Sequence, residues 1–150
     1  MKVSRLRPLA RLLLAGLLLA GPSSPWAHSY VFQLGQAAGA THYFGVICSQ
    51  EGGNDTDHLF LELRTLTANG PLVSAQVIKD RIATNTTDPI SGDGFYSPAT
   101  RTRGGNGHYT VLINKSGPGV VSFAVTAHCL DATGTQHTGT DGLVYQYQDQ

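Results

Sequence analysis

The 150-residue chain is poor in the residues and motifs on which most catalytic sites depend. It has two cysteines, one methionine and one tryptophan, and only 13% of its residues are charged. It contains no His-Glu-x-x-His motif, no Gly-x-Ser-x-Gly turn and no Cys-x-x-Cys pair. Glu51 and Glu62 are its only glutamates, and nothing in the sequence indicates paired carboxylates for acid–base work. These absences favour a protein that is not an enzyme.

The charge balance gives no sign of a nucleic-acid partner. Ten Lys and Arg residues match ten Asp and Glu residues in the whole chain, but four of the basic ones precede residue 12. Residues 30–150 therefore keep six basic and ten acidic residues and carry a net charge of −4 with histidine neutral. Arg101 and Arg103 alternate on one expected strand, and two charges are too few for a nucleic-acid-binding patch.

The first 29 residues have the pattern of an export signal. The basic segment consists of Lys2, Arg5, Arg7 and Arg11. The apolar segment 12–20 that follows is too short to span a bilayer, and the Gly-Pro-Ser-Ser-Pro sequence of residues 21–25 breaks any helix after it. Ala27 and Ser29 are small residues at positions −3 and −1 of a cut before Tyr30, which predicts a signal peptide over residues 1–29. A cut after Ala27 is the alternative, and it would make His28 the first residue.

This signal sets the expected compartment. No second apolar run of spanning length follows it, so we expect no integral membrane segment after signal removal. We expect the chain to be exported, either to the periplasm or to the cell exterior, where disulfides form and persist.

Residues 30–150 are expected to form one all-β domain, because no segment needs helical periodicity and short alternating segments are separated by turn residues. The expected strands cover residues 30–34, 41–48, 58–66, 72–78, 108–114, 120–129 and 143–147, with shorter segments at 81–85 and 99–103. Turn residues cluster at 51–55, 68–71, 104–107 and 115–119. About eight short strands at near-regular spacing predict an antiparallel β-sandwich or jelly roll.

The two cysteines are predicted to form an inter-strand disulfide. Cys48 alternates in phase with Val46, and Cys129 alternates in phase with Val125, so both thiols are expected to face the core. Because export favours oxidation, a bridge is preferred over two free thiols. An inward-facing thiol is also a poor candidate for catalysis.

Four segments of the chain follow the order of a known family. They are Tyr43-Phe44-Gly45-Val46, Leu59-Phe60-Leu61-Glu62-Leu63, the Gly-x-Tyr-x-Val strand Gly107-His108-Tyr109-Thr110-Val111, and the closing strand Val121-Ser122-Phe123-Ala124-Val125-Thr126. Over about residues 41–129 the chain resembles the bacterial pre-peptidase C-terminal domain family, a small β-sandwich. Domains of that family usually accompany secreted hydrolases, so the resemblance implies an accessory or binding module.

Two of the six histidines are candidates for a metal site. His128 points away from the core by alternation, and His137 lies in the turn that follows. A hairpin would bring the two imidazoles together on one surface, where they could bind copper or zinc. The spacing fixes no third ligand. His42, His58 and His108 stand at strand starts, where exposure is expected.

Two further metal hypotheses rest on other parts of the chain. If cleavage falls after Ala27, the amino group and imidazole of His28 could bind copper together with a second histidine. In the polar loop 86–98, Asp88 and Asp93 offer oxygen ligands for calcium, although their spacing is not that of an EF-hand. In that loop, turn formation by Asp, Pro and Gly is the alternative.

The sequence therefore favours an exported β-sandwich with a non-enzymatic binding or structural role and no required cofactor. The expected partner is a protein or a surface glycan. The alternative is a metal-binding exported protein that uses copper at His28 or at His128 and His137, or calcium at Asp88 and Asp93. A third hypothesis is assembly through an exposed strand edge.

Overall fold

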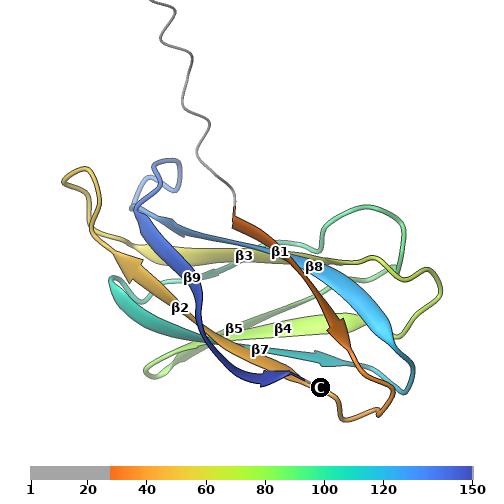
Figure 1. The fold of residues 1–150 in the computed structure, drawn as a ribbon. Coiled ribbons are helices and arrows are strands. Elements are labelled where there is room, and N and C mark those ends of the chain that lie inside the picture. The colour runs from red at the N-terminus through yellow and green to blue at the C-terminus, as the bar shows by residue number, and fades with distance from the viewer. Residues whose placement is uncertain (1–27, 150) are drawn as a thin grey trace, which may run out of the picture.

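The computed structural model describes residues 28–149, and every element in this range is a β-strand, as the sequence predicted. The strands are β1 (His28–Leu34), β2 (His42–Ser49), β3 (His58–Thr65), β4 (Val73–Lys79), β5 (Ile82–Thr87), β6 (Thr100–Thr102), β7 (Gly107–Lys115), β8 (Val121–Leu130) and β9 (Gly139–Asp149). They form two layers packed face to face (Figure 1). Within residues 28–149 there is no apolar helix of membrane-spanning length.

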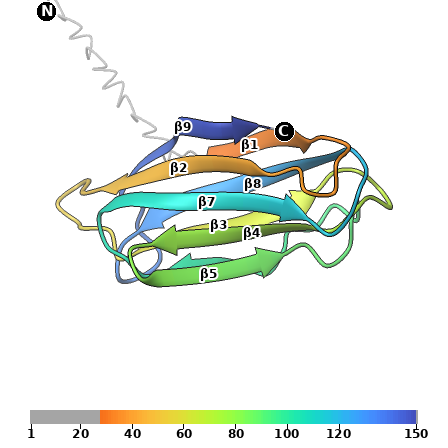
Figure 2. The same cartoon turned by 90° about the horizontal axis from the view of Figure 1, so that it is seen from below.

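The strand order is that of a jelly roll with one added strand. One sheet has the order β1-β8-β3-β6, and the other has the order β5-β4-β7-β2-β9, in which β9 extends the sheet beside β2. Figure 2 shows the five-stranded sheet in front, with β8 and β3 behind it. Only the connection from β4 to β5 stays within one sheet. The fold therefore depends on pairing between segments that are far apart in the sequence.

Alternation along the strands decides which side chains enter the core. In β3, Leu59, Leu61 and Leu63 are fully buried, while the residues between them lie on the outer face of the four-stranded sheet. Phe123 and Val125 of β8 are fully buried in the same way. Each such side chain stabilises the fold by about 1.5–3 kcal/mol relative to exposure. The core fills the space between the sheets, which leaves the two outer faces for other contacts.

The predicted disulfide is present and joins the two sheets. Cys48 of β2 and Cys129 of β8 are bonded, with 5.5 Å between their Cα atoms and an 81-residue sequence separation. Both residues are at most 1% exposed. Since β2 belongs to the five-stranded sheet and β8 to the four-stranded sheet, the bridge is a cross-link through the core.

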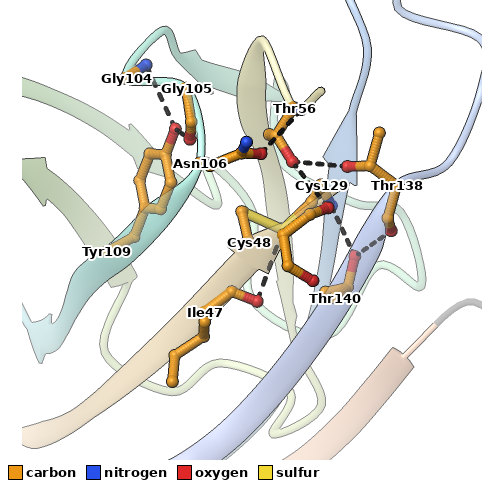
Figure 3. Close-up of a disulfide and its surroundings, with 11 residues drawn as sticks. Ile47, Cys48, Thr56, Gly104, Gly105, Asn106, Tyr109, Cys129, Thr138 and Thr140 are labelled. Carbon is orange, nitrogen blue, oxygen red and sulfur yellow. Dashed lines mark hydrogen bonds between the residues drawn. A yellow bond between two sulfur atoms is a disulfide. The ribbon is translucent and has the colours of Figure 1, made fainter. Parts of the chain in front are cut away.

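Threonine side chains surround this disulfide (Figure 3). The Cys129 N–H donates to the hydroxyl of Thr140 at 2.9 Å, and that hydroxyl donates to the Thr138 carbonyl at 3.1 Å. The hydroxyls of Thr56 and Thr138 lie 2.6 Å apart, and the Thr56 N–H donates to the side-chain oxygen of Asn106 at 2.9 Å. These bonds tie together three connections that cross between the sheets, β2–β3, β6–β7 and β8–β9.

Tyr109 fastens the start of β7 to the turn before it (Figure 3). Its hydroxyl donates to the Gly105 carbonyl at 2.7 Å and accepts the Gly104 N–H at 3.2 Å. Burial raises the pKa of this hydroxyl, the bond from Gly104 opposes the shift, and nearby Asp57 and Asp80 add to it. Tyr109 therefore stays a neutral donor, in an arrangement like the tyrosine corner of other sandwiches.

The opposite end of the sandwich contains a buried lysine. The turn predicted at residues 115–119 begins one residue later, because Lys115 is still part of β7. Lys115 is the last residue of β7 and is only 6% exposed. Its ammonium group donates to the carbonyls of Gly35 and Gly119, which lie in the β1–β2 and β7–β8 connections. Lys115 continues the inward alternation of Val111 and Ile113, a signal that the sequence already contained.

Two of the three histidines expected at the surface are buried, so that expectation is wrong for them. His42 is 0% exposed, and its ring lies 4.2 Å from that of Phe32 and 5.7 Å from that of Phe44. His58 is 1% exposed. His108 alone is exposed, as expected. His42 is in phase with Phe44, so alternation places it in the core even though it begins a strand.

Removing the disulfide should destabilise the fold strongly. For the Cys48→Ala/Cys129→Ala variant we expect the free energy of unfolding to fall by about 4.5 kcal/mol, because the unfolded chain regains the entropy of a long closed loop. Urea unfolding of the variant and of the reduced wild-type protein should give the same loss. A loss under about 1 kcal/mol would show that the other contacts between the sheets suffice without the bridge.

Removing the Tyr109 hydroxyl should also weaken the fold, but less. The Tyr109→Phe variant leaves the Gly105 carbonyl and the Gly104 N–H without their partner, so we expect a loss of about 1–3 kcal/mol. Tyr96→Phe is the matched control, because among the described residues the Tyr96 hydroxyl accepts one long bond, of 3.4 Å, from Thr126. Equal losses in thermal unfolding of both variants would contradict the role of Tyr109.

Candidate functional site

The outer face of the four-stranded sheet brings together guanidinium, aromatic and imidazole side chains from five parts of the chain. We call this set the arginine–ring face, and it consists of Phe60, Arg64, Tyr96, Arg101, His128 and His137. Phe60 and Arg64 are on β3, Arg101 is on β6 and His128 is on β8. Tyr96 comes from the long β5–β6 loop, and His137 comes from the β8–β9 connection. All except the exposed Arg101 are half-buried.

The first row of this face crosses three strands. Phe60 is directly opposite Arg101 on one side and His128 on the other. The guanidinium carbon of Arg101 lies 5.1 Å from the centroid of the Phe60 ring. The centroid of the His128 ring lies 5.9 Å from the same Phe60 centroid. A guanidinium within about 6 Å of a ring face is in the range of a cation–π interaction. The row is therefore held by side-chain contacts as well as by strand pairing.

A second guanidinium–ring pair lies farther along β3. The guanidinium carbon of Arg64 lies 4.9 Å from the centroid of the Tyr96 ring, and its Nη1 donates to the Gly94 carbonyl at 3.3 Å. The loop that carries Tyr96 runs beside β3, where the Ser97 N–H donates to the Leu63 carbonyl at 2.7 Å. These bonds position a loop side chain on the sheet face.

The two histidines predicted to meet do lie together. The ring centroids of His128 and His137 are 4.7 Å apart, with the rings at 78° to each other. An antiparallel bridge between Leu130 and His137 extends the edge of β8 and brings His137 beside it. Metal binding by this pair stays a prediction. Among residues 28–149, no group of three His, Cys, Asp or Glu residues is arranged to hold a metal ion.

The turn between these histidines is organised by Asp131. The Oδ1 atom of Asp131 accepts the Thr133 hydroxyl at 2.6 Å and the N–H groups of Thr133, Gly134 and Gln136 at 3.1–3.4 Å. The bond from the Thr133 hydroxyl, followed by the backbone bonds, holds the pKa of this carboxyl below its usual range. Gly134 has φ +72°, a backbone conformation that side chains with a Cβ rarely adopt.

His58 lies beside this turn, under the surface. Its Nδ1 is 2.8 Å from Asp57 Oδ2, and the same oxygen accepts a bond of 2.7 Å from Arg103. A Cβ added to Gly134 would be 3.7 Å from His58 Cε1, so the turn covers the ring. His58 therefore lies beneath the arginine–ring face and is not part of it. The Arg103 guanidinium bonds to the Asp57 carboxylate, unlike Arg64 and Arg101, which contact aromatic rings.

The two aspartates predicted as calcium ligands play separate parts. Asp88 is 1% exposed; its Oδ2 accepts the Thr65 N–H at 2.6 Å and its Oδ1 accepts the Ile90 N–H at 3.3 Å. Asp93 is exposed and accepts the Phe95 N–H at 2.9 Å. Both carboxylates therefore accept backbone bonds within their turns, as the alternative to a calcium site proposed. Asp88 also links the end of β5 to the end of β3.

His28 is the first residue of β1, and its backbone is opposite Ala127 of β8. Residues 1–27, which include most of the predicted signal peptide, lie outside the described residues. A cut before Tyr30 would remove two of the seven paired positions of β1, whereas a cut after Ala27 would leave β1 whole.

Sequence reasoning identified the two histidines of the face and missed its other members. The alternation of residues along β3 could have predicted that Phe60 and Arg64 point outward, since they lie between the buried leucines. No local signal identified Arg101 or Tyr96, because their contacts depend on how the β5–β6 loop and β6 lie against β3.

Asp131 should make stability depend on pH in acid. Because its folded pKa is lowered, its contribution is present above the unfolded value of about 3.9 and is lost as the pH falls through the folded value. We expect Asp131→Ala to be less stable than wild type at pH 7, with the difference shrinking below about pH 4. Thermal unfolding between pH 2 and 7 measures this, with Asp93→Ala as control. A difference that stays constant down to pH 2 would contradict the assignment.

Comparison with known proteins adds no family to this geometry. No protein-family model, curated protein or solved structure matches this chain. A function for it must therefore be argued from the arginine–ring face itself.

Proposed function

We propose that the chain is an exported, non-enzymatic binding protein whose arginine–ring face holds an acidic polysaccharide. The observation that carries this proposal is the pair of guanidinium groups, Arg101 over Phe60 and Arg64 over Tyr96, on one sheet face. The disulfide is compatible with an oxidising, exported location. The resemblance to an accessory domain of secreted hydrolases agrees with a binding role.

Stacked guanidinium groups favour a ligand that carries carboxylates. Stacking on a ring uses the face of the guanidinium, while its N–H donors point outward in its plane and match the two oxygens of a carboxylate. Arg101 is exposed and can reach a ligand above the sheet. Arg64 is half-buried, its Nε is buried and its Nη1 donates to the Gly94 carbonyl, so fewer of its donors remain for a ligand. The rings of Phe60 and Tyr96 already contact these guanidinium groups. A ligand would therefore meet positive charge and hydrogen-bond donors here, and less uncovered aromatic surface.

Glu62 lies between Phe60 and Arg64 on β3, beside Arg101. Burial raises the pKa of its carboxyl, and the nearby Arg101 charge opposes the shift. An acidic ligand on this face therefore has to bind through the guanidinium groups on either side of this carboxyl.

The architecture favours a polysaccharide over an acidic peptide. Peptides commonly bind to a sheet by adding a strand to an exposed edge through backbone hydrogen bonds. On this face, β3 is paired with β6 and β8, and β8 is paired with β1 and β3, so the backbone of both is occupied. Recognition on this face therefore comes from side chains on several strands, which suits a chain with a carboxylate on each sugar.

Replacing either stacked arginine should weaken binding to an acidic glycan. We expect Arg101→Gln and Arg64→Gln each to lower the affinity for alginate by at least about tenfold, because each removes charge-assisted hydrogen bonds worth about 1.5–3 kcal/mol. Calorimetric titration at low salt measures this. Arg81→Gln is the matched control, since Arg81 is an exposed arginine in the β4–β5 turn.

Three results would contradict the proposal. An equal loss in Arg81→Gln would show that net charge alone attracts the glycan. Equal binding of a neutral glucan would remove the role of carboxylates. Tighter binding of polyglutamate than of alginate would assign the face to acidic peptides.

A further inference from the structure

The strand β5 forms one edge of the five-stranded sheet (Figure 2). Within residues 28–149, β4 is its one neighbour in that sheet. The pairing of the two strands is regular, from Ile82 opposite Lys79 to Thr87 opposite Ser74, and contains no bulge. The far side of β5 is therefore a straight row of backbone groups.

The hydrogen bonds to β4 show which backbone groups of β5 face outward. The Asp88 N–H donates to the Val73 carbonyl at 3.0 Å, so these two residues form a hydrogen-bonded pair. Such pairs alternate along an antiparallel ladder, so Thr86 and Thr84 also bond to β4. The residues between them direct their N–H and C=O groups away from β4, to a side where no strand within residues 28–149 lies. They are Ala83, Asn85 and Thr87.

This edge lacks the features that commonly keep sheet edges apart, which are lysine, proline, bulges and extreme shortness. Two other edge strands have such features. β6 has three residues and carries Arg101, and β9 pairs with β2 through two register shifts. In contrast, β5 has six residues, with the sequence Ile-Ala-Thr-Asn-Thr-Thr, and includes no charge and no proline. A regular, uncharged edge of this kind is ready to pair with another strand.

A second copy of the chain fits this edge in antiparallel register. With Asn85 opposite its own counterpart, Ala83 of each copy is opposite Thr87 of the other, so all three outward residues are paired. An asparagine amide both donates and accepts hydrogen bonds, so it can bond to its own counterpart across the axis. The same register lays the start of one β5 against the end of the other. Ile82 at the start is 44% exposed, and Ile90 beyond the end is 60% exposed.

We propose that the chain forms a weak homodimer in which two β5 strands pair in antiparallel register and join the two five-stranded sheets into one. A single pair of strands buries little surface, at the low end of specific interfaces, so the dimer dissociates on dilution. Opposed side chains of an antiparallel pair share one face, so the two-fold axis is perpendicular to the sheet. Both arginine–ring faces therefore point to the same side of the dimer. Dimer formation does not depend on the binding of a polysaccharide.

The first test follows amide hydrogen exchange of the unaltered protein at about 50 µM and about 1 mM, across the range in which a small interface associates. The amides of Ala83, Asn85 and Thr87 should exchange at least about threefold more slowly at the higher concentration. Those of Thr84 and Thr86, which bond to β4, should be protected equally at both. Protection of the three outward amides that does not change with concentration would assign the edge to a segment of the same chain. No protection at either concentration would also overturn the proposal.

The second test measures the association constant by sedimentation equilibrium without any glycan. We expect Asn85→Lys to lower it at least about tenfold, because two ammonium groups would face each other across the axis. Gln33→Lys is the matched control, since it places the same charge on β1, the edge strand of the other sheet. Both residues are exposed, so the fold persists. A wild-type protein that stays monomeric at about 1 mM, or a loss in Gln33→Lys equal to or larger than that in Asn85→Lys, would overturn the proposal.

Discussion

The disulfide between Cys48 and Cys129 is the constraint on which the rest of this structure depends. Nearly every connection in the jelly roll crosses from one sheet to the other, so apart from the β4–β5 pair the sheets are built from segments that are not neighbours in the sequence. A covalent link between β2 and β8 joins residues 81 positions apart and fixes the two sheets against each other. The threonine bonds around it extend this link to the crossing connections at the same end.

The same constraint locates the chemistry of the molecule. Both sulfur atoms lie in the core between the sheets, and His42 and His58 are buried as well, so the side chains open to a ligand lie on the outer faces and turns. Because Cys129 is fixed, the residue before it, His128, has a fixed place on the outer face of β8. From there the row of contacts runs through Phe60 to Arg101 and, on the other side, to His137. The face is thus built around a strand that is paired on both sides and carries the disulfide.

The sequence predicted local features well and distant contacts poorly. Alternation placed β3 and β8 nearly to the residue and paired the cysteines, because strand periodicity is a local signal. The meeting of His128 and His137 was predictable, since one hairpin joins them. The contacts of Arg101 and Tyr96 were not, because sheet order depends on the packing of the whole chain. His42 was misjudged by its place at a strand start, although its phase with Phe44 indicated burial.

The central claim is that the arginine–ring face is the surface through which this protein meets its ligand. The most direct measurement is a map of backbone amide shifts in ¹⁵N-labelled protein during titration with alginate oligomers. The account predicts shifts that concentrate on β3, β6, the end of β8 and the loop around Tyr96, with the five-stranded sheet around His108 unchanged. Shifts concentrated on the outer face of the five-stranded sheet, or along the edge strands alone, would contradict it.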